Sequence, residues 1–252
     1  MKRVLRKIMI ALAYLLVWQG LALMVGSPLK LPSPVETAGA LLRIGSTAPF
    51  YQSIGLTLLR VLAGFAAGVA VGAALGAVTA AWPLADEFLA PLRTVIKATP
   101  VTSFIILVLL WLTSALTPVF IAFLMVTPIV WANVREGARA VDKGLLEMAR
   151  VFRLSRGTVI TKIYAPAVLP QFTAACTTGL GFAWKSGVAA EVIASTELSI
   201  GRSIMESKLY LEVPELFAWT LAVILLSMLA ERAMLALIQR PKSSGRKRYD
   251  TA

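Results

Sequence analysis

Histidine is absent from this chain of 252 residues, and cysteine occurs once, at Cys176. An intramolecular disulfide is therefore impossible, and zinc sites built from cysteine and histidine have no ligand set. We accordingly expect no metal site and no cofactor. The sequence also lacks the G-x-x-x-x-G-K-[ST] phosphate loop, so ATP would have to be bound by another protein.

Charged residues are scarce at 15%, whereas soluble domains contain about a quarter. Apolar residues make up 58% of the chain, and the mean hydropathy is +0.78. This balance is typical of a protein that crosses a membrane several times. The net charge of +12 would suggest a nucleic-acid partner in a soluble protein, but here the basic residues flank apolar runs and indicate orientation in a bilayer. We therefore expect no nucleic-acid partner.

Apolar stretches that could form spanning helices, of about 20 residues each, recur along the chain. Residues 98–134 carry no charge, a run too long for one helix, and TSALTP at 113–118 supplies a break. The sequence thus predicts an all-α membrane protein with one domain over residues 1–252 and about six spans, or five if 101–134 folds differently. The expected spans are 8–25, 57–81, 101–113, 117–134, 168–188 and 214–238.

The first apolar stretch, from Ile8 to Val25, has two interpretations. It follows basic residues, as the core of a secretory signal peptide does, but its 18 uncharged residues exceed the length typical of such a core. No convincing small-x-small cleavage site follows it. We interpret the stretch as a retained first span, with a signal peptide as the alternative.

Basic residues are distributed unequally between the two sides that six spans define. Both termini and the segments 82–100 and 135–166 fall on one side and carry eighteen lysines and arginines, whereas the opposite side carries four. Because positive residues accumulate in the cytoplasmic loops of membrane proteins, we expect both termini and 135–166 in the cytoplasm. The basic cytoplasmic tail, 240–252, would lie beside anionic lipid.

Glycine recurs at a constant interval of four along the second expected span, at Gly64, Gly68, Gly72 and Gly76. Four residues advance a helix by about 400°, so these glycines form one slowly drifting stripe. Without side chains there, the backbone of a neighbouring helix can approach closely. The neighbour could belong to the same chain or to a second subunit, and we favour packing within the chain.

A polar segment separates the fourth and fifth expected spans. Its apolar residues fall near one helical face and its arginines on the others, which predicts a short amphipathic helix outside the bilayer. The apolar residues are Leu145, Leu146, Ala149, Val151 and Phe152. Such a helix is too short to be stable alone. Its apolar face therefore needs a partner, which could be the underside of the bundle, the lipid headgroups or another protein.

The same segment resembles the EAA loop of the permease subunits of ATP-binding-cassette (ABC) importers, whose pattern is roughly E-A-A-x-x-x-G followed by I-x-x-P. The matching positions are Glu147, Ala149, Ser155, Arg156, Ile163 and Pro166. Further stretches are similar to the nitrate, sulfonate and taurine branch of these permeases, so that the resemblance covers about residues 30–238. These stretches are LPSPVET (31–37), LLRVLAGFAAGVAVGAALG (58–76), APLRTVIKATP (90–100) and AEVIAS (190–195) followed by Gly201.

The chain also departs from the family pattern. Met148 stands where the second alanine of the motif is usual, and Arg153 stands where the glycine is usual. The segment that follows Pro100 differs as well. These departures leave the transported substrate unidentified by the sequence.

What the resemblance implies is the fold of a type I ABC importer permease, with about six transmembrane helices and a cytoplasmic coupling helix within 143–162. It further implies a subunit of the bacterial plasma membrane that moves a small polar or anionic solute. Its partners would be a second copy of the chain, two copies of a cytoplasmic ABC ATPase, an extracytoplasmic substrate-binding protein and membrane lipid.

Under this hypothesis the coupling segment contacts the ATPase, and the permease itself needs no catalytic residue. The residues expected to carry the contact are Glu147, Ala149, Arg150, Phe152, Arg153 and Ser155. Glu147 would pair with the ATPase, and Arg153 would alter the close approach that glycine permits. From the local residues alone, Glu147 could equally be a solvated charge at a helix N-terminus.

Two charges close to the fifth expected span, Lys185 and Glu191, are candidates for pathway or structural charges. Glu191 lies six residues after Lys185, off its helical face, so the two cannot form an i,i+4 pair. Lys185 could instead extend to the outer headgroups, as could Arg60 at the outer start of the second span. The segment 191–215 would lie outside, where it could receive a binding protein or simply be solvated.

Two other classes of function are less consistent with the sequence. A self-contained secondary transporter or channel would need buried ionisable groups or broken helices around a midplane site, and would not need an amphipathic cytoplasmic helix. An intramembrane enzyme would need a nucleophile held beside a base, and no residues of the chain suggest that arrangement.

Overall fold

The protein is all-helical over the residues that its computed structural model describes, 2–238, as the sequence predicts. The expected basic tail lies outside this range. In chain order the elements are α1 (Lys2–Val25), α2 (Pro34–Gly45), α3 (Ala48–Ala81), α4 (Pro83–Ala98), α5 (Val101–Val108), α6 (Thr117–Arg139), α7 (Lys143–Val151), α8 (Arg156–Val159), the π-helical turn η1 (Ile160–Tyr164), α9 (Ala165–Ala194), α10 (Ile200–Leu209) and α11 (Val213–Ile238).

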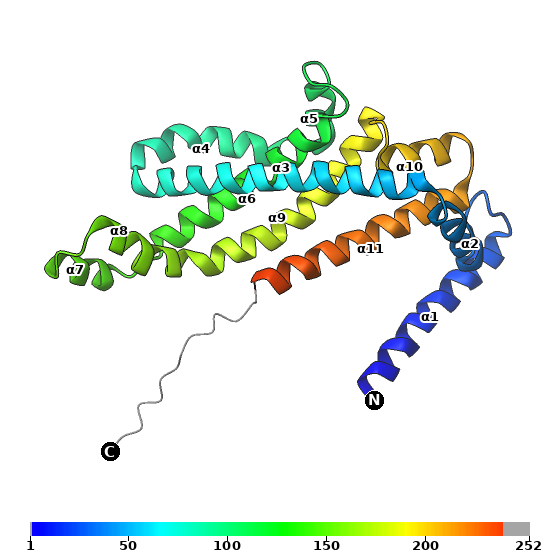
Figure 1. Cartoon of the computed structure of the whole chain (residues 1–252), viewed down its shortest axis with the longest axis horizontal. Coiled ribbons are helices and arrows are strands. Elements are labelled where there is room, and N and C mark those ends of the chain that lie inside the picture. Colours follow the sequence, from blue (N-terminus) through cyan, green and yellow to red (C-terminus); the bar gives the residue numbers. More distant parts are fainter. Residues whose placement is uncertain (1, 239–252) are drawn as a thin grey trace.

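Three long helices, α3, α6 and α9, lie side by side and form the core of the bundle (Figure 1). Their apolar side chains make one buried cluster, which includes Val61 of α3, Val126 of α6 and Trp184 of α9. With 34 residues, α3 is about 51 Å long, whereas the hydrocarbon core of a bilayer is about 30 Å thick. At least one end of α3 therefore extends beyond the apolar layer unless the helix is strongly tilted.

The glycine stripe of α3 faces α6 of the same chain. A Cβ atom placed at Gly64 would lie 2.3 Å from the carbonyl oxygen of Val119, and one at Gly72 would lie 2.7 Å from that of Thr127. A Cβ atom at Gly68 would lie 2.9 Å from the carbonyl oxygen of Phe123, and one at Gly76 would lie 2.9 Å from that of Trp131. Since real Cβ atoms do not come this close to a backbone, only glycine allows the two helices to pack at this separation.

Residues 82–100, which the sequence suggests to be a cytoplasmic loop, instead form a helix. α4 starts immediately after α3 and runs back beside it (Figure 1), then meets α5 at a bend of 100°. The expected span at 101–113 is therefore wrong as a separate helix, because α5 ends at Val108 and only the pair α4–α5 is long and apolar enough to cross a membrane. One of the charged residues of α4, Asp86, pairs with Arg93 of its own helix and with arginines of α6.

Four single helices in the described range are long and apolar enough to span a membrane: α1, α3, α6 and α11. The bent pair α4–α5 would be a fifth. α9 has 30 residues and packs on α3 and α6, but it is not among the helices that qualify as single spans. The expected count of six spans is reached only when the bent pair and α9 are both included.

One end of the bundle is capped by α2, α10 and the start of α11. Ile44 of α2, Ile200 of α10 and Trp219 of α11 belong to one buried cluster there. The stretch LPSPVET encodes the start of α2, because Ser33 and Glu36 form a reciprocal capping box and a proline occupies the first turn. This end lies opposite α7 and α8 along the long axis of the molecule (Figure 1).

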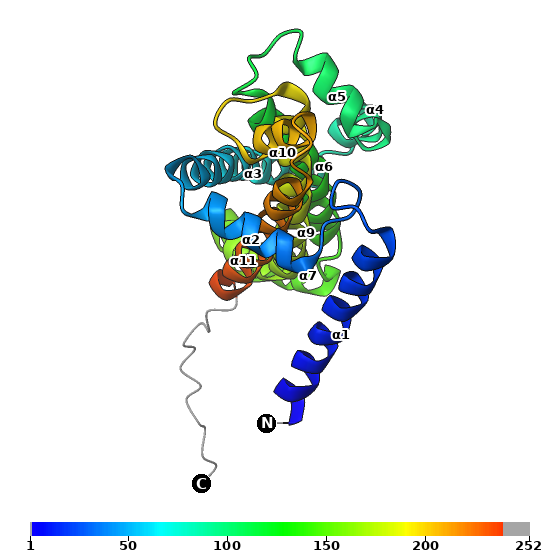
Figure 2. The ribbon, with the colours of Figure 1, turned by 90° about the vertical axis from the view of Figure 1, so that its right-hand side faces the viewer.

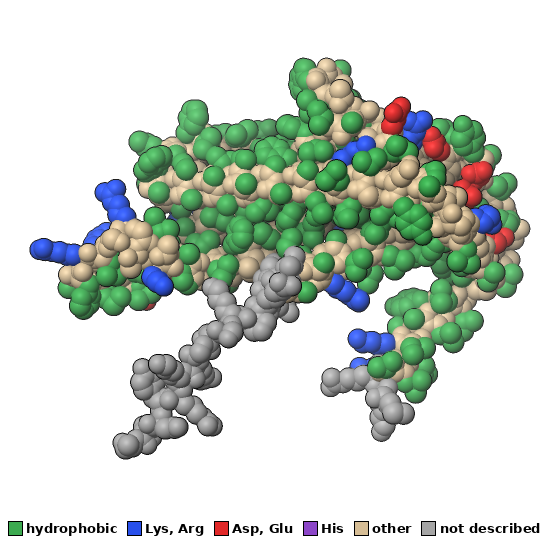
Figure 3. All heavy atoms as spheres, in the orientation of Figure 1, with side chains coloured by type: hydrophobic (Ala, Val, Ile, Leu, Met, Phe, Trp, Pro, Cys, Tyr) green, Lys and Arg blue, Asp and Glu red, His purple; other side chains and the backbone are tan. Residues whose placement is uncertain are grey.

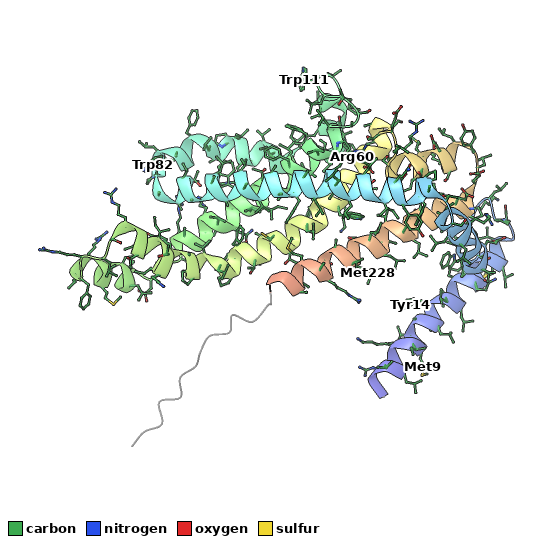
Figure 4. The ribbon with its side chains drawn as sticks, viewed as in Figure 1. Met9, Tyr14, Arg60, Trp82, Trp111 and Met228 are labelled. Atoms are coloured by element: carbon green, nitrogen blue, oxygen red, sulfur yellow. The ribbon has the colours of Figure 1, made fainter. Side chains whose placement is uncertain are left out.

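The first helix, α1, diverges from the bundle (Figure 2). Only 6% of its most apolar 18-residue stretch is buried against the rest of the protein. It is held near its C-terminal end, where the indole Nε1 of Trp18 donates a hydrogen bond to the carbonyl oxygen of Pro32 at 3.0 Å and its ring stacks on Phe217. Along the rest of α1, side chains such as Met9 and Tyr14 project into open space (Figure 4).

Candidate functional site

The coupling segment expected at 143–162 lies at one end of the bundle, beyond the last turn of α6 (Figure 1). Its first element, α7, is capped by Asp142, whose carboxylate accepts a hydrogen bond from the backbone N–H of Gly144 at 2.7 Å. This cap satisfies a free N–H group of the first turn. Basic side chains gather at the same end of the molecule (Figure 3).

Arg153 ends α7 in a left-handed conformation, with φ of +46°. The backbone N–H of Leu154 donates to the carbonyl oxygen of Ala149 at 2.9 Å, and that of Arg153 donates to Arg150 at 3.1 Å. These two bonds define a Schellman motif, whose left-handed position glycine usually fills. The structure thus gives a local reason for the glycine of the EAA pattern, which is a backbone conformation that an arginine adopts at a cost of about 1 kcal/mol.

One face of α7 packs against the rest of the chain. Ala149 is buried in a small cluster with Val141 and Ile163, and Leu146 and Val159 pack against its edge. The alanine of the motif therefore has a packing role at the junction of α7 and the helix that leads into α9. Ile163, the isoleucine of the I-x-x-P pattern, supplies the opposite side of this contact.

The opposite face of α7 is apolar and uncovered. Val151 is 78% exposed and Phe152 is 70% exposed, and Leu145 and Met148 are exposed on the same side. The sequence had suggested a single apolar face that joins Ala149 to Phe152, but the structure separates them. We call the four exposed residues, Leu145, Met148, Val151 and Phe152, the α7 apolar stripe.

Charged residues surround the α7 apolar stripe. Arg150, Arg153 and Arg156 are exposed, and so is Glu147. No ion pair joins Glu147 to another residue of the described range. The carboxylate and the guanidinium groups are thus free to meet groups on a separate molecule.

The coupling segment continues into α9 without an intervening loop. Ser155 caps α8 by accepting a hydrogen bond from the backbone N–H of Thr158 at 3.2 Å. From Arg156 the chain is helical through η1 to the end of α9. A displacement of α8 would therefore be transmitted along α9 into the core, because an unbroken helix is stiff.

A cluster around Asp86 lies at the same end of the bundle, and sequence reasoning missed it. The carboxylate of Asp86 on α4 pairs with Arg93 at 3.3 Å and with Arg139 of α6 at 3.0 Å, and it also accepts from Arg135 of α6. Arg93 in turn lies 5.3 Å from the ring centre of Trp131, whose Nε1 donates to Thr79 of α3. We call Asp86, Arg93, Arg135 and Arg139 the Asp86 cluster. It ties α4 to α6.

A second cluster lies toward the α10 end of the bundle, around Glu191 near the end of α9. Glu191 is fully buried, and its carboxylate accepts hydrogen bonds from the hydroxyl of Thr57 at 2.9 Å and from the backbone N–H of Gly201 at 3.3 Å. The guanidinium of Arg60 pairs with it at 3.3 Å. We call Thr57, Arg60, Glu191 and Gly201 the Glu191 cluster. It joins α3, α9 and α10.

The sequence allowed Arg60 to extend to the outer lipid headgroups, but in the structure its guanidinium is bound within the protein. Besides Glu191, its guanidinium donates to the carbonyl oxygens of Leu198 at 3.2 Å and Glu197 at 3.1 Å. Figure 4 shows Arg60 on α3, far from Trp82 at the other end of that helix. Its partners lie more than 130 residues away in the sequence, so that no local pattern could have revealed them.

The structure does not bring the two candidate charges of α9 together. Glu191 is enclosed in its cluster, whereas Lys185 is exposed and makes no ion pair with any residue in 2–238. Gly201, which follows the AEVIAS stretch, is required by close packing, since a Cβ there would lie 2.4 Å from that of Glu191. This contact explains physically why the glutamate and the glycine occur together in the resemblance.

Known proteins with similar sequences are transport permeases. The chain is 31% identical over 228 residues to the riboflavin transport system permease protein of Chloroflexus aurantiacus, covering 87% of this chain and 85% of the relative. It is 25% identical over 229 residues to the taurine transport system permease protein of Escherichia coli, covering 88% and 83%.

A solved structure, described as the crystal structure of an amino acid ABC transporter with histidines, has a similar fold. The TM-score is 0.62 at 16% identity, and the match covers 79% of this chain and 94% of that one. In addition, residues 68–243 match the family described as binding-protein-dependent transport system inner membrane component. From the match over these residues we conclude that the chain belongs to this family, the inner-membrane permease components of ABC importers.

Proposed function

We propose that this chain is one of two identical permease subunits that form the pathway of an ABC importer, each driven by a cytoplasmic ATPase. The observation that carries the proposal is the α7 apolar stripe, which lies outside the bundle, among basic residues, on a segment continuous with α9. The permease performs no catalysis itself. Its coupling end and both termini face the cytoplasm, in agreement with the distribution of basic residues.

The α7 apolar stripe is more stable when it is buried in a groove of a soluble protein than when it is exposed to water. An aromatic side chain gains about 1.5–3 kcal/mol when it passes from exposed to buried, so Phe152 alone is a substantial anchor. The arginines beside the stripe would pair with acidic residues at the rim of the groove, and Glu147 would pair with a basic one. Arg153 sets the position of Phe152 through the left-handed end of α7.

Coupling would follow from the mechanical connection between α7 and the core. Closure of two ATPases on ATP would move the docked α7 helices, and α8, η1 and α9 would transmit the movement as one helical rod. α9 packs on both α3 and α6 and ends in the Glu191 cluster. The rod therefore connects the cytoplasmic contact with the opposite face, where α9 meets α10. Such rigid-body changes require contacts that differ between two states, and ATP binding to the partner supplies the difference.

The opposite end of the molecule suits an extracytoplasmic binding protein. Acidic side chains gather there over α10 and the adjoining turns (Figure 3). Glu197 and Glu212 are exposed, and Glu206 pairs with Arg202. The cargo is a small polar or anionic solute. The names of the relatives, which include riboflavin and taurine permeases, agree with that class.

The docking proposal is tested by co-purification. Phe152→Ala in the full-length chain should lower recovery of the ATPase with the detergent-solubilised permease by about tenfold or more, since about 1.5–3 kcal/mol of burial is lost. Phe88→Ala on α4 is the matched control, because Phe88 is also strongly exposed but lies away from α7. Equal recovery of the ATPase with the Phe152 variant and the control would contradict the proposal, as would unimpaired solute uptake.

Orientation can be tested with the same preparation. With Cys176 replaced by alanine, a single Ser155→Cys substitution should react with a membrane-impermeant thiol reagent in inside-out vesicles and stay unreactive in right-side-out vesicles. The reverse pattern would place the coupling segment on the outer side and would exclude contact with a cytoplasmic ATPase.

A further inference from the structure

One face of α9 is left uncovered by the rest of the chain. Its residues follow a spacing of three and four, so that they share one side of the helix. They are Ala174, Thr178, Gly181, Phe182 and Lys185. We call them the open α9 face. The remaining sides of α9 pack against α3 and α6, with Leu180 and Trp184 in the buried core.

The open α9 face differs in composition from the other uncovered faces of the bundle. The exposed side of α3 carries Leu59 and Leu62, and that of α11 carries Ile224, Leu225 and Leu229. Such branched apolar side chains suit contact with lipid. The open α9 face has one large apolar side chain, Phe182, and beside it presents a hydroxyl, an ammonium and a glycine at which an added Cβ would meet nothing within 4 Å. Polar groups on spanning helices face protein or water rather than lipid.

Lys185 lies inside the layer bounded by the two charged clusters. It precedes Glu191 by six residues, which places it about 9 Å farther from the α10 end along α9. Its neighbour Gly187 contacts Val61 of α3, well within the core. One turn farther toward the α10 end, Ala189 packs in a cluster with α5. α5 thus covers α9 one turn beyond Lys185, whereas the Lys185 side chain itself is exposed.

We propose that Lys185 is the cationic group with which the translocation pathway attracts its solute, and that the solute therefore carries an anionic group such as a sulfonate, phosphate or carboxylate. This inference rests on the proposed function, since a second copy of the chain would face the open α9 face and enclose water between the two. An ammonium that lacks a carboxylate partner among the described residues attracts anions strongly where water is confined by apolar walls. Thr178, two turns inward on the same face, offers a hydroxyl along the route.

Cysteine chemistry can measure this potential directly, because the chain has one native cysteine, which is buried. In a Cys176→Ala background, Gly181→Cys places a thiol one turn from Lys185, about 6 Å away, at a position with free space for it. The full-length chain in membrane vesicles is treated with a sulfonate-bearing and with a trimethylammonium-bearing methanethiosulfonate, and the two reaction rates are compared.

The expected result is a rate ratio that follows the charge at position 185. Lys185→Gln should lower the ratio of anionic to cationic reaction by about tenfold, as Coulomb's law gives at this distance for a partly screened site. Lys185→Arg should preserve the ratio, and Lys185→Glu should reverse it. Leu229→Cys, on the apolar side of α11, is the control that should react slowly with both reagents.

Two outcomes would overturn the inference. If Gly181→Cys reacts as slowly as Leu229→Cys with both reagents, the open α9 face does not border water. If it reacts but the ratio ignores the charge at 185, Lys185 does not set the potential. Thr178→Cys serves as a second reporter should the Gly181 variant fold poorly. The assay needs no ATPase, so a failure of ATPase docking with an intact charge effect would refute the coupling proposal alone.

Discussion

The two charged clusters stabilise opposite ends of the bundle in different ways. Asp86 is balanced by three arginines, and its cluster is partly open to water, with the Arg139 side chain 40% exposed. Glu191 is fully buried and is balanced by one arginine, with a hydroxyl and a backbone N–H as neutral donors. Water can relax the first cluster after a change, but cannot reach the carboxylate of the second.

This difference predicts which end of the bundle tolerates amino-acid substitutions. A buried ion pair that loses one partner leaves an uncompensated charge, whereas exposed pairs contribute little. The Glu191 cluster also fixes the backbone, since Gly201 touches Glu191 and the amide of Ile200 donates to Thr57. The Asp86 cluster joins side chains only. We therefore expect the α10 end to be rigid and sensitive to substitution, and the α7 end to be adaptable.

The largest effect is expected for Glu191→Ala. Removal of the carboxylate leaves Arg60 without its buried partner and leaves the Thr57 hydroxyl without its acceptor. The free energy of unfolding should fall by about 3–5 kcal/mol. Thermal unfolding of the purified protein in detergent measures the loss, and Glu197→Ala, an exposed glutamate close by, is the control. Equal melting temperatures for the two variants would show that the Glu191 cluster is not a stabilising element.

Gly201→Ala should destabilise the same end by a purely steric route. The added Cβ would meet the Cβ of Glu191 at 2.4 Å and the backbone nitrogen of Val192 at 2.5 Å, so α10 must move away from α9. Overpacking of this kind costs about 1–3 kcal/mol. Gly181→Ala on the same helical bundle is a control with open space around it. A melting temperature unchanged from the parent would contradict the close contact.

Asp86→Asn should have a smaller effect, and one that depends on salt. The three arginines would repel one another, but asparagine keeps an acceptor oxygen and the 40% exposed Arg139 can reorient into water, so we expect a loss of about 1–2 kcal/mol. Raising the ionic strength should recover part of that loss, because salt screens exposed charges more than buried ones. Unfolding of Asp86→Asn and of Glu191→Ala at two salt concentrations therefore distinguishes the clusters. A similar salt response of both variants would remove the contrast between them.

The smallest effect is a stabilisation by Arg153→Gly. Glycine adopts the left-handed end of α7 without strain, so the variant should gain about 1 kcal/mol locally. Because short helices outside a core generally open in local unfolding events, amide hydrogen exchange of residues 145–152 is the appropriate measurement. Faster exchange in the variant would show that the arginine side chain stabilises the end of α7 by contacts that outweigh the backbone strain.

Sequence reasoning anticipated the parts of this molecule that depend on local pattern. Apolar runs located the long helices, and the constant interval of the α3 glycines indicated one packing face. The EAA-like residues indicated an amphipathic element between α6 and α9, where α7 is found. In each case the information lies within a few turns of one helix, which is the range over which periodicity and caps operate.

Contacts between segments that are distant in the sequence could not be predicted from local pattern. α4 looked like a loop because Asp86 and Arg93 are charged, but these two residues pair with each other, and Asp86 also pairs with two arginines of α6. Likewise, Arg60 and Glu191 gave no sign of each other across 131 residues. The direction of Phe152 also depends on tertiary structure, since Ala149 rather than the phenylalanine occupies the limited space against Ile163.

The meshing of α3 with α6 has a consequence for motion. Four successive turns of α3 rest against backbone carbonyl groups and Cβ atoms of α6, and no α3 side chain separates the two helices there. Axial sliding of either helix would bring Cα atoms of α3 into steric clash with oxygen atoms of α6, so the two helices must move together as one rigid unit. Opening and closing of the subunit therefore depends on the elements that pack less tightly around the α3–α6 pair. Hinges should be sought in those elements rather than in α3 or α6.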